Sequence, residues 1–324
     1  MRSLRMVTAA LAVAAVVTTA ATASASASTV HFQVFARTGL RLTDIVWTGR
    51  QFLYVDNTTN RVAAAGPSGM PLRPFAQMPR QVEETRCSPS PGAHGFAAGD
   101  LYCHSPDNKI YRISPDGKTV TDFAVLPHSP RSDGALTFDT VGAFGYALLA
   151  ATGRSGAATP AGGSVFAIDP AGKVRRIGRY ANPGGAEEIA VAPAGFGSAA
   201  GQVLLTVDAG TSGSLVAMNA RGQARTLLTL PDGPNPLAVL APGRTPRAGA
   251  AQAGLYVTDT LSRAVFFVPA SELRPFAGDV VVGSEVRGLF WVVRPRGSGF
   301  AAITLPTNLG GKKYNFEGAI YVAG

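Results

Sequence analysis

The apolar residues of this chain are gathered in short runs, which polar and turn-forming residues interrupt at short intervals. Beyond residue 27, runs rich in Val, Ile, Leu, Tyr and Phe alternate with Gly, Pro, Asp, Asn and Ser about every eight to twelve positions. A helix would instead repeat its apolar residues with a period near 3.6, and such periodicity is nearly absent. The pattern predicts an all-β protein built from short strands.

One strand–turn–strand unit recurs along the chain. Its clearest copy covers residues 254–268, where two apolar strands flank a polar turn, and a similar copy begins at Phe52. A tight turn follows each copy, and the last residues of successive turns lie 48, 55, 50 and 49 positions apart. These turns are Pro67-Ser68-Gly69, Pro115-Asp116-Gly117, Pro170-Ala171-Gly172, Ala220-Arg221-Gly222 and Pro269-Ala270-Ser271. A repeat of about fifty residues predicts stacked supersecondary units.

Each unit holds four predicted strands, so one domain over residues 28–324 accommodates six units. Four-stranded sheets can bury both faces by packing radially around an axis, and this arrangement leaves only short edges. We therefore predict a six-bladed β-propeller with antiparallel four-stranded blades.

The last two blades are assigned by continuing this period. The fifth blade is expected to contain residues 237–240 followed by the unit at residues 254–268. The sixth blade is expected to contain three strands, at residues 289–293, 300–305 and 316–322. A strand near the mature N-terminus, at residues 31–36, would complete this blade and close the ring.

The N-terminus has the features of a secretory signal peptide. Arg2 and Arg5 precede a short segment rich in Ala and Val, and small residues alternate up to Ala27. An Ala-x-Ala pattern after a short apolar segment indicates cleavage after Ala25 or Ala27 rather than a membrane span. We therefore expect residues 1–27 to be removed, which would give a secreted, extracellular protein that does not cross a membrane.

The net charge of the chain is +9, and loss of Arg2 and Arg5 with the signal peptide lowers it to +7. A positive surface can attract anionic polymers or lipid headgroups. The basic residues are scattered apart from residues 173–179 and the pair Lys312 and Lys313, and no basic stripe is interleaved with aromatic residues. The pattern indicates an ordinary solvated surface and does not support nucleic-acid binding.

The only two cysteines, Cys87 and Cys103, lie in candidate strands joined by a connection rich in Pro and Gly. Antiparallel pairing would bring them together, and an exported protein can oxidise them. A disulfide that closes a loop of about 15 residues stabilises the fold by roughly 3 kcal/mol. The alternative, a redox pair or a thiolate metal site, lacks the close Cys-x-x-Cys spacing. We therefore expect a disulfide.

Acid or amide side chains stand just before the innermost strand of every predicted blade. Residues at this place converge on one mouth of the central channel, because the innermost strands surround the axis. They are Asp44, Glu84, Asp133, Glu187 with Glu188, Asn235 and Glu285. Convergent carboxylates repel one another unless a cation or protons neutralise them, and oxygen ligands suit Ca²⁺, Mg²⁺ or Mn²⁺, and occasionally Zn²⁺.

The ring of acids therefore indicates a candidate site for one divalent metal ion. Its candidate ligands are Asp44, Glu187, Asn235 and Glu285. The competing interpretation is structural: water separates the carboxylates, or they cap turns at the starts of strands.

Two of the repeat units resemble those of known propellers. Leu53-Tyr54-Val55-Asp56 is followed by Asn60-Arg61-Val62, and Leu255-Tyr256-Val257-Thr258-Asp259 is followed by Arg263-Ala264-Val265. These segments resemble the repeat of NHL-type propellers and of the related SMP-30/gluconolactonase/strictosidine-synthase-like propellers. The resemblance spans about residues 40–270 and implies the fold, whereas the activities of these proteins range from lyases and lactonases to pure binding modules.

In the gluconolactonase-like family, an acidic residue near the first blade holds a divalent metal together with an Asn and an Asp from later blades. Matched by sequence, Asp44 resembles the first ligand, where the family usually has Glu, and Asn235 in Asn-Pro-Leu resembles the family's Asn-Gly-Leu. Counting blades instead, the family's Asn corresponds to Glu187 and its Asp to Asn235. Residues 131–134, Arg-Ser-Asp-Gly, resemble an Arg-x-Asn-Asp-Gly substrate-binding segment without its Asn, which implies a substrate-binding role for Arg131.

Two hypotheses of function follow. The first is a secreted, monomeric propeller that binds a small molecule, glycan or protein at the mouth of its central channel without catalysis. The second is a metal-dependent lactonase or esterase, in which the metal polarises a carbonyl and a carboxylate, Glu188 or Asp133, takes a proton from a bound water. The sequence contains no Gly-x-Ser-x-Gly elbow, His-Glu-x-x-His helix or P-loop, and it does not decide whether the protein is an enzyme.

Overall fold

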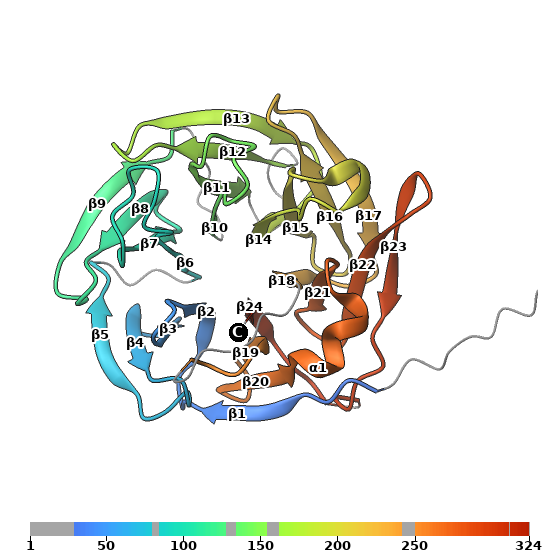
Figure 1. Ribbon diagram of the computed structural model, residues 1–324, viewed down its shortest axis with the longest axis horizontal. Helices are drawn as coiled ribbons and strands as arrows, with labels where there is room; N and C mark the ends of the chain where they lie inside the picture. Colours follow the sequence, from blue (N-terminus) through green and yellow to red (C-terminus); the bar gives the residue numbers. More distant parts are fainter. Residues whose placement is uncertain are drawn as a thin grey trace, which may run out of the picture.

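The computed structural model describes residues 29–79, 84–127, 134–153, 162–241, 250–310 and 312–323. These residues form six four-stranded antiparallel sheets, which are arranged as blades around a central axis (Figure 1). The predicted six-bladed β-propeller is therefore confirmed. The predicted signal peptide lies outside the described residues.

The first four blades follow chain order, and each runs from an innermost strand to an outermost one (Figure 1). The first contains Leu42–Trp47 (β2), Phe52–Asp56 (β3), Arg61–Ala65 (β4) and Arg73–Gln77 (β5). The second contains Arg86–Pro89 (β6), Leu101–Ser105 (β7), Lys109–Ile113 (β8) and Val120–Val125 (β9). The third contains Ala135–Phe138 (β10), Leu148–Gly153 (β11), Gly163–Ile168 (β12) and Val174–Tyr180 (β13). The fourth contains Gly185–Val191 (β14), Val203–Asp208 (β15), Gly213–Met218 (β16) and Ala224–Leu230 (β17).

The last two blades interleave along the chain. The fifth contains Pro234–Val239 (β18), Val280–Ser284 (β21), Phe290–Arg296 (β22) and Gly299–Thr304 (β23). The closing blade contains, from axis to rim, Phe316–Val322 (β24), Gly254–Asp259 (β19), Ala264–Pro269 (β20) and Gln33–Arg37 (β1). The chain thus leaves the fifth blade after one strand, builds the middle of the closing blade, and then returns.

The expected membership of these two blades is wrong in two respects. β19 and β20, which cover the repeat unit at residues 254–268, lie in the closing blade and not beside β18. β22 and β23, which cover the strands expected at residues 289–293 and 300–305, lie in the fifth blade and not in the closing one. β19 pairs with β24, whereas β18 pairs with β21. β18, β19 and β21 are buried along nearly their whole length, so their apolar patterns fit either partner. The repeat period counts strands, but it does not specify which sheet edge each strand joins.

Both ends of the chain meet in the closing blade, as predicted for a ring closed by an N-terminal strand. β1 pairs with β20 at the rim, from Gln33 opposite Phe267 to Arg37 opposite Ala264. β24 supplies the innermost strand from the other end of the chain, and the C-terminus lies beside the axis (Figure 1). β18 of the fifth blade precedes β19 and β20 of the closing blade, and β21, β22 and β23 of the fifth blade precede β24. Because their segments alternate along the chain, the two blades can be completed only together.

Six apolar clusters fill the spaces between neighbouring blades and make up the core. The cluster between the second and third blades is typical. Phe96 and Tyr102 pack edge to face against Phe138, with ring centroids 4.9 and 5.7 Å away. Each blade therefore buries both of its faces, which explains why its middle strands are largely apolar instead of alternating strictly.

Helical structure is confined to short segments in the described residues: Ala270–Leu273 (α1) and the 3-10 turns Gly197–Ala199 (η1) and Arg274–Phe276 (η2). Within that part of the chain, no helix is long and apolar enough to cross a membrane.

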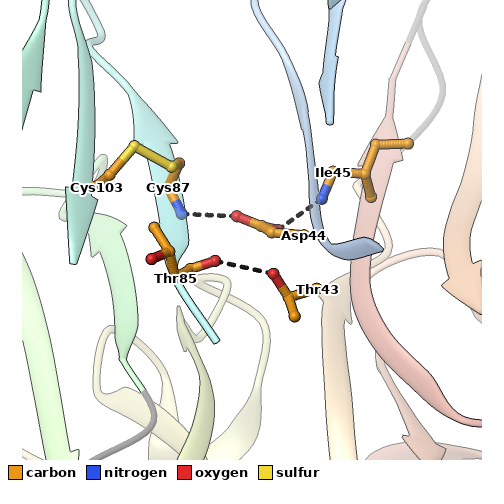
Figure 2. The surroundings of a disulfide bond; sticks show 6 residues. All are labelled: Thr43, Asp44, Ile45, Thr85, Cys87 and Cys103. Carbon is orange, nitrogen blue, oxygen red and sulfur yellow. Dashed lines mark hydrogen bonds between the residues drawn. A yellow bond between two sulfur atoms is a disulfide. The ribbon is translucent and has the colours of Figure 1, made fainter. Parts of the chain in front are cut away.

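The predicted disulfide between Cys87 and Cys103 is present. These residues face each other in the antiparallel pair of β6 and β7, with a Cα separation of 4.0 Å. The bond fastens β6, a four-residue innermost strand, to its own blade. Figure 2 shows that the same segment is also tied to the first blade. There the backbone N–H of Cys87 donates to the Asp44 carboxylate, and the Thr43 hydroxyl donates to the carbonyl oxygen of Thr85.

Gly318 in β24 allows the closing blade to approach the first blade. A Cβ atom at this position would lie 2.7 Å from the Cα of Asp44 and 3.0 Å from the carbonyl oxygen of Thr43. Because both are backbone atoms, Gly318→Ala is expected to lower the free energy of unfolding by about 1–3 kcal/mol in chemical denaturation. The matched control is Gly299→Ala in β23, where the nearest atom would be 4.0 Å away and the expected change is under about 1 kcal/mol. Equal losses in the two variants would contradict the close approach.

Candidate functional site

Four of the innermost strands carry a β-bulge at their first residues. Between two successive pairs of facing residues, the innermost strand has one more residue than the neighbouring strand. The bulges place Thr43, Glu187, Asn235 and Glu317 at equivalent positions at the N-terminal ends of β2, β14, β18 and β24. A bulge turns its side chain away from the regular alternation of the strand, which is why these residues gather at the axis.

Threonines in the second strands hold two of these bulges in place. The backbone N–H of Glu188 donates to the hydroxyl of Thr206 at 3.0 Å, and that of Gly318 donates to the hydroxyl of Thr258 at 2.9 Å. Thr206 in turn donates to the carbonyl oxygen of Asn235 at 2.9 Å. A side-chain hydroxyl therefore satisfies the backbone donor that the bulge removes from the regular ladder.

Arg86, at the start of β6, occupies the centre of this end of the channel. Only 1% of its surface is exposed. Its Nη2 donates to Asn235 Oδ1 at 3.0 Å and to Glu317 Oε2 at 3.2 Å, and its Nη1 donates to the carbonyl oxygen of Thr43. The guanidinium of the second blade thus contacts the first, fifth and closing blades at once.

Asn235 and Asp44 extend this network. Nδ2 of Asn235 donates to Glu317 Oε2 at 2.9 Å and to Glu187 Oε2 at 3.5 Å. The two carboxylate oxygens of Asp44 accept from the backbone N–H groups of Ile45, at 2.7 Å, and of Cys87, at 2.6 Å (Figure 2). We call the set of six buried residues at this end of the channel the polar layer: Asp44, Arg86, Glu187, Glu188, Asn235 and Glu317.

The polar layer holds four carboxyl groups and one guanidinium. Burial alone would lower the pKa of Arg86, but the surrounding carboxylates, Glu317 foremost, outweigh it and hold that pKa above its ordinary value. Burial raises the pKa of Asp44 to about 6, although Arg86 opposes the shift. Burial also raises the pKa of Glu188 to about 8, against the opposing effect of Arg86 and with a further contribution from Asp44. At neutral pH the layer therefore contains a permanent cation and at least one carboxyl that holds its proton.

A cavity of about 370 Å³, here called the cup, adjoins the polar layer. All six innermost strands line it, starting at Asp44 and Glu188 and continuing to the C-terminal ends of the strands. Its wall includes the partly exposed side chains of Val239, Ala319 and Tyr321. The central channel is therefore closed by the polar layer at one end and forms an open cup at the other.

The structure brings together four of the residues singled out in the sequence: Asp44, Glu187, Glu188 and Asn235. Glu285 is not in an innermost strand, because it follows β21. Its Oε1 accepts from Asn315 Nδ2 at 3.0 Å, and burial, with nearby Glu317 and Asp208, raises its pKa to about 8.

The remaining candidates are Glu84, Arg131 and Asp133. Glu84 precedes β6 with a φ of 58°, and the neighbouring Arg86 is the residue that enters the layer. Arg131 and Asp133 lie outside the described residues.

Sequence reasoning missed Arg86 and Glu317. Phe316–Val322 was expected to form a strand, but the innermost position of the last blade was assigned to residues 289–293, so Glu285 was selected in place of Glu317. In residues 316–320 and 186–190 alike, a Glu follows an apolar residue and two apolar residues come after one intervening position, and this likeness was a usable signal. Arg86 carried no such signal, because it is a cation among positions selected for acids.

No family model matches this chain, and no curated protein matches its sequence. A solved structure of a nidogen/laminin complex contains a similar chain, with a TM-score of 0.55 and 8% identity over 86% of this chain and 84% of that one. A protein of unknown function from Bacteroides caccae matches with a TM-score of 0.45 and 12% identity, over 78% of this chain and 73% of that one. At this level of identity the nidogen/laminin match supports the propeller fold alone. The resemblance to NHL and SMP-30 propellers stays a prediction.

The raised pKa of Glu188 predicts how stability depends on pH. The stabilisation from its protonated form is complete below the ordinary value of 4.5 and is lost as the pH rises to about 8, where the buried carboxyl ionises. Glu188→Gln cannot ionise, so we expect it to be more stable than the parent by on the order of 2–4 kcal/mol at about pH 8, and nearly equal to it near pH 4.

Urea denaturation across this pH range measures the difference. Asp122→Asn, which changes an exposed carboxylate in β9, serves as the control and should show no comparable trend. If the difference in free energy of unfolding between Glu188→Gln and the parent stays constant from pH 4 to pH 8, the assignment of a buried, protonated carboxyl is refuted.

Proposed function

We propose that this protein is a ligand-binding propeller that holds a small molecule in the cup, without catalysis of its own. The observation that carries the proposal is a concave cavity at the meeting point of six innermost strands, closed by polar groups at one end and lined by polar and apolar surface in similar measure. Small-molecule sites in proteins are typically cavities of roughly 300–1,000 Å³ with a few polar groups on an apolar wall. A volume of about 370 Å³ favours a small molecule over a glycan or protein partner.

Binding is proposed at the cup and not at the opposite end of the channel, where the acids were first expected to act. At that end the polar groups bind one another: Arg86 contacts Asn235 and Glu317, and Asn235 contacts Glu187. A ligand there would have to displace contacts that already compensate buried charge, which costs several kcal/mol. The cup offers its surface without this cost.

Metal-dependent hydrolysis stays the alternative hypothesis, but the contacts favour it less. Asn235 Oδ1, which the resemblance assigns to the metal, accepts a hydrogen bond from Arg86, and both oxygens of Asp44 accept backbone hydrogen bonds. At Asn235 the guanidinium of Arg86, whose Nη2 lies 3.0 Å from Oδ1, would repel a divalent cation. Among the described residues, no group of three or more His, Cys, Asp or Glu side chains is placed to hold a metal ion.

Export to the extracellular space is part of the proposal. The Ala-x-Ala pattern that ends near Ala27 supports cleavage of a signal peptide, and the Cys87–Cys103 disulfide suits an oxidising compartment. We propose a monomer, because a ring closed on itself leaves no long unpaired sheet edge for a second copy.

A fluorescent apolar probe tests binding in the cup. We expect the neutral dye N-phenyl-1-naphthylamine to bind the protein with a Kd in the micromolar range. Ala319→Trp, which fills the cup from β24, should weaken this binding at least tenfold. The matched control, Ala302→Trp on the exposed face of the rim strand β23, should leave it within about twofold.

Equal binding by both variants and the parent would place the dye elsewhere and contradict the proposal. A parallel titration with Ca²⁺, Mg²⁺, Mn²⁺ and Zn²⁺ distinguishes ligand binding from the alternative hypothesis of a metal-dependent hydrolase. A rise in thermal stability with one of these ions, together with turnover of a lactone or ester, would favour the hydrolase.

A further inference from the structure

We infer that the ligand of the cup is an organic amine or a related organic cation, whose charged group lies against Glu188 while its apolar body packs on the wall. This inference rests on the proposed function, because it assigns the chemical class of the molecule held in the same cup. Three observations carry it: the charge of the floor, the atoms left to receive a ligand, and the composition of the wall.

The floor of the cup belongs to a layer in which negative groups outnumber positive ones. Asp44, Glu187, Glu188 and Glu317 share one guanidinium, that of Arg86. Buried charge is costly unless an opposite charge or a proton compensates it. A second cation that approaches from the cup side would supply this compensation, whereas a carboxylate or phosphate ligand would add to the excess.

Glu188 is the acid best placed to receive such a group. Both oxygens of Asp44 accept backbone hydrogen bonds, and the guanidinium of Arg86 is directed toward Asn235 and Glu317. The Glu188 carboxyl accepts at Oε1 from its neighbour Ile189, at 3.2 Å, and the residue lines the cup. An ammonium group beside Glu188 favours the ionised form of its carboxyl, and the carboxylate oxygens then accept strong hydrogen bonds from up to three ammonium donors.

The wall excludes competing cations and favours an organic body. Although the chain contains 29 Lys and Arg residues, none of the described residues that line the cup is Lys, Arg or His. Beside the acids the wall includes the partly exposed residues Ala190, Val239 and Ala319, which offer apolar surface. A bare divalent ion prefers about six to eight oxygen ligands, whereas an alkyl amine needs few acceptors and gains from apolar contact.

Three ligands of equal chain length test the class. n-Hexylamine, 1-hexanol and hexanoate compete with bound N-phenyl-1-naphthylamine at about pH 8, where the amine is charged. We expect hexylamine to displace the dye at a concentration at least tenfold lower than hexanol, and hexanoate to be the weakest of the three. Glu188→Gln should reduce the preference for amine over alcohol to less than threefold.

Glu285→Gln is the matched control. It removes a partly buried acid whose pKa is also raised to about 8, but Glu285 does not line the cup. The preference for amine should therefore persist in this variant. If Glu188→Gln and Glu285→Gln lose the preference for hexylamine over hexanol to the same extent, overall charge and not contact with Glu188 selects the ligand. This result would overturn the inference.

The outcomes separate the two proposals. If hexanol or hexanoate displaces the dye as well as hexylamine does, the ligand class is wrong while binding in the cup stands. If the dye does not bind, or if Ala319→Trp leaves its binding unchanged, the proposed function itself fails. Displacement by a millimolar divalent ion that Glu188→Gln abolishes would identify a metal site and overturn the amine. The comparison of the three ligands on the parent protein decides the class even if Glu188→Gln fails to fold.

Discussion

The arrangement of the blades around the axis depends on the hydrogen bonds made by the buried guanidinium of Arg86. It belongs to the second blade and donates hydrogen bonds to Thr43, Asn235 and Glu317, which belong to the first, fifth and closing blades. A charge at this depth is tolerated only when opposite charges and hydrogen bonds surround it, and breaking such a group typically costs about 3–5 kcal/mol. The cation and the ring of acids therefore require each other.

This contact also gives the channel its polarity. The bulges at the starts of the innermost strands direct Glu187, Asn235 and Glu317 toward Arg86, and the polar layer closes that end. Toward the other end the same strands return to regular alternation and present Val239, Ala319 and Tyr321 to the cup. A change of one residue in register, repeated in four blades, thus separates a structural polar end from a concave end that can bind a ligand.

Much of the fold could be predicted from the sequence because it depends on local patterns. Short apolar runs, turns such as Pro115-Asp116-Gly117 and a period near fifty predicted six blades of four strands, the closing N-terminal strand and the disulfide. Pairing in the last two blades could not be predicted, because β18, β19 and β21 are buried along nearly their whole length and fit more than one edge. The polar residues Asp44, Glu187 and Asn235 were found from their predicted place before innermost strands. Arg86 was not, because its role depends on groups from three other blades that only the folded ring brings together.

The central claim is that Arg86 is sealed inside the polar layer, and proton exchange of the arginine side chains tests it most directly. In protein labelled with ¹⁵N-arginine, the guanidinium signal of Arg86 can be assigned through its contacts with the Asn235 amide. We expect its protons to exchange with water far more slowly than those of exposed arginines such as Arg287. Exchange of every arginine side chain at the same fast rate would mean that water enters this end of the channel, and it would contradict the account.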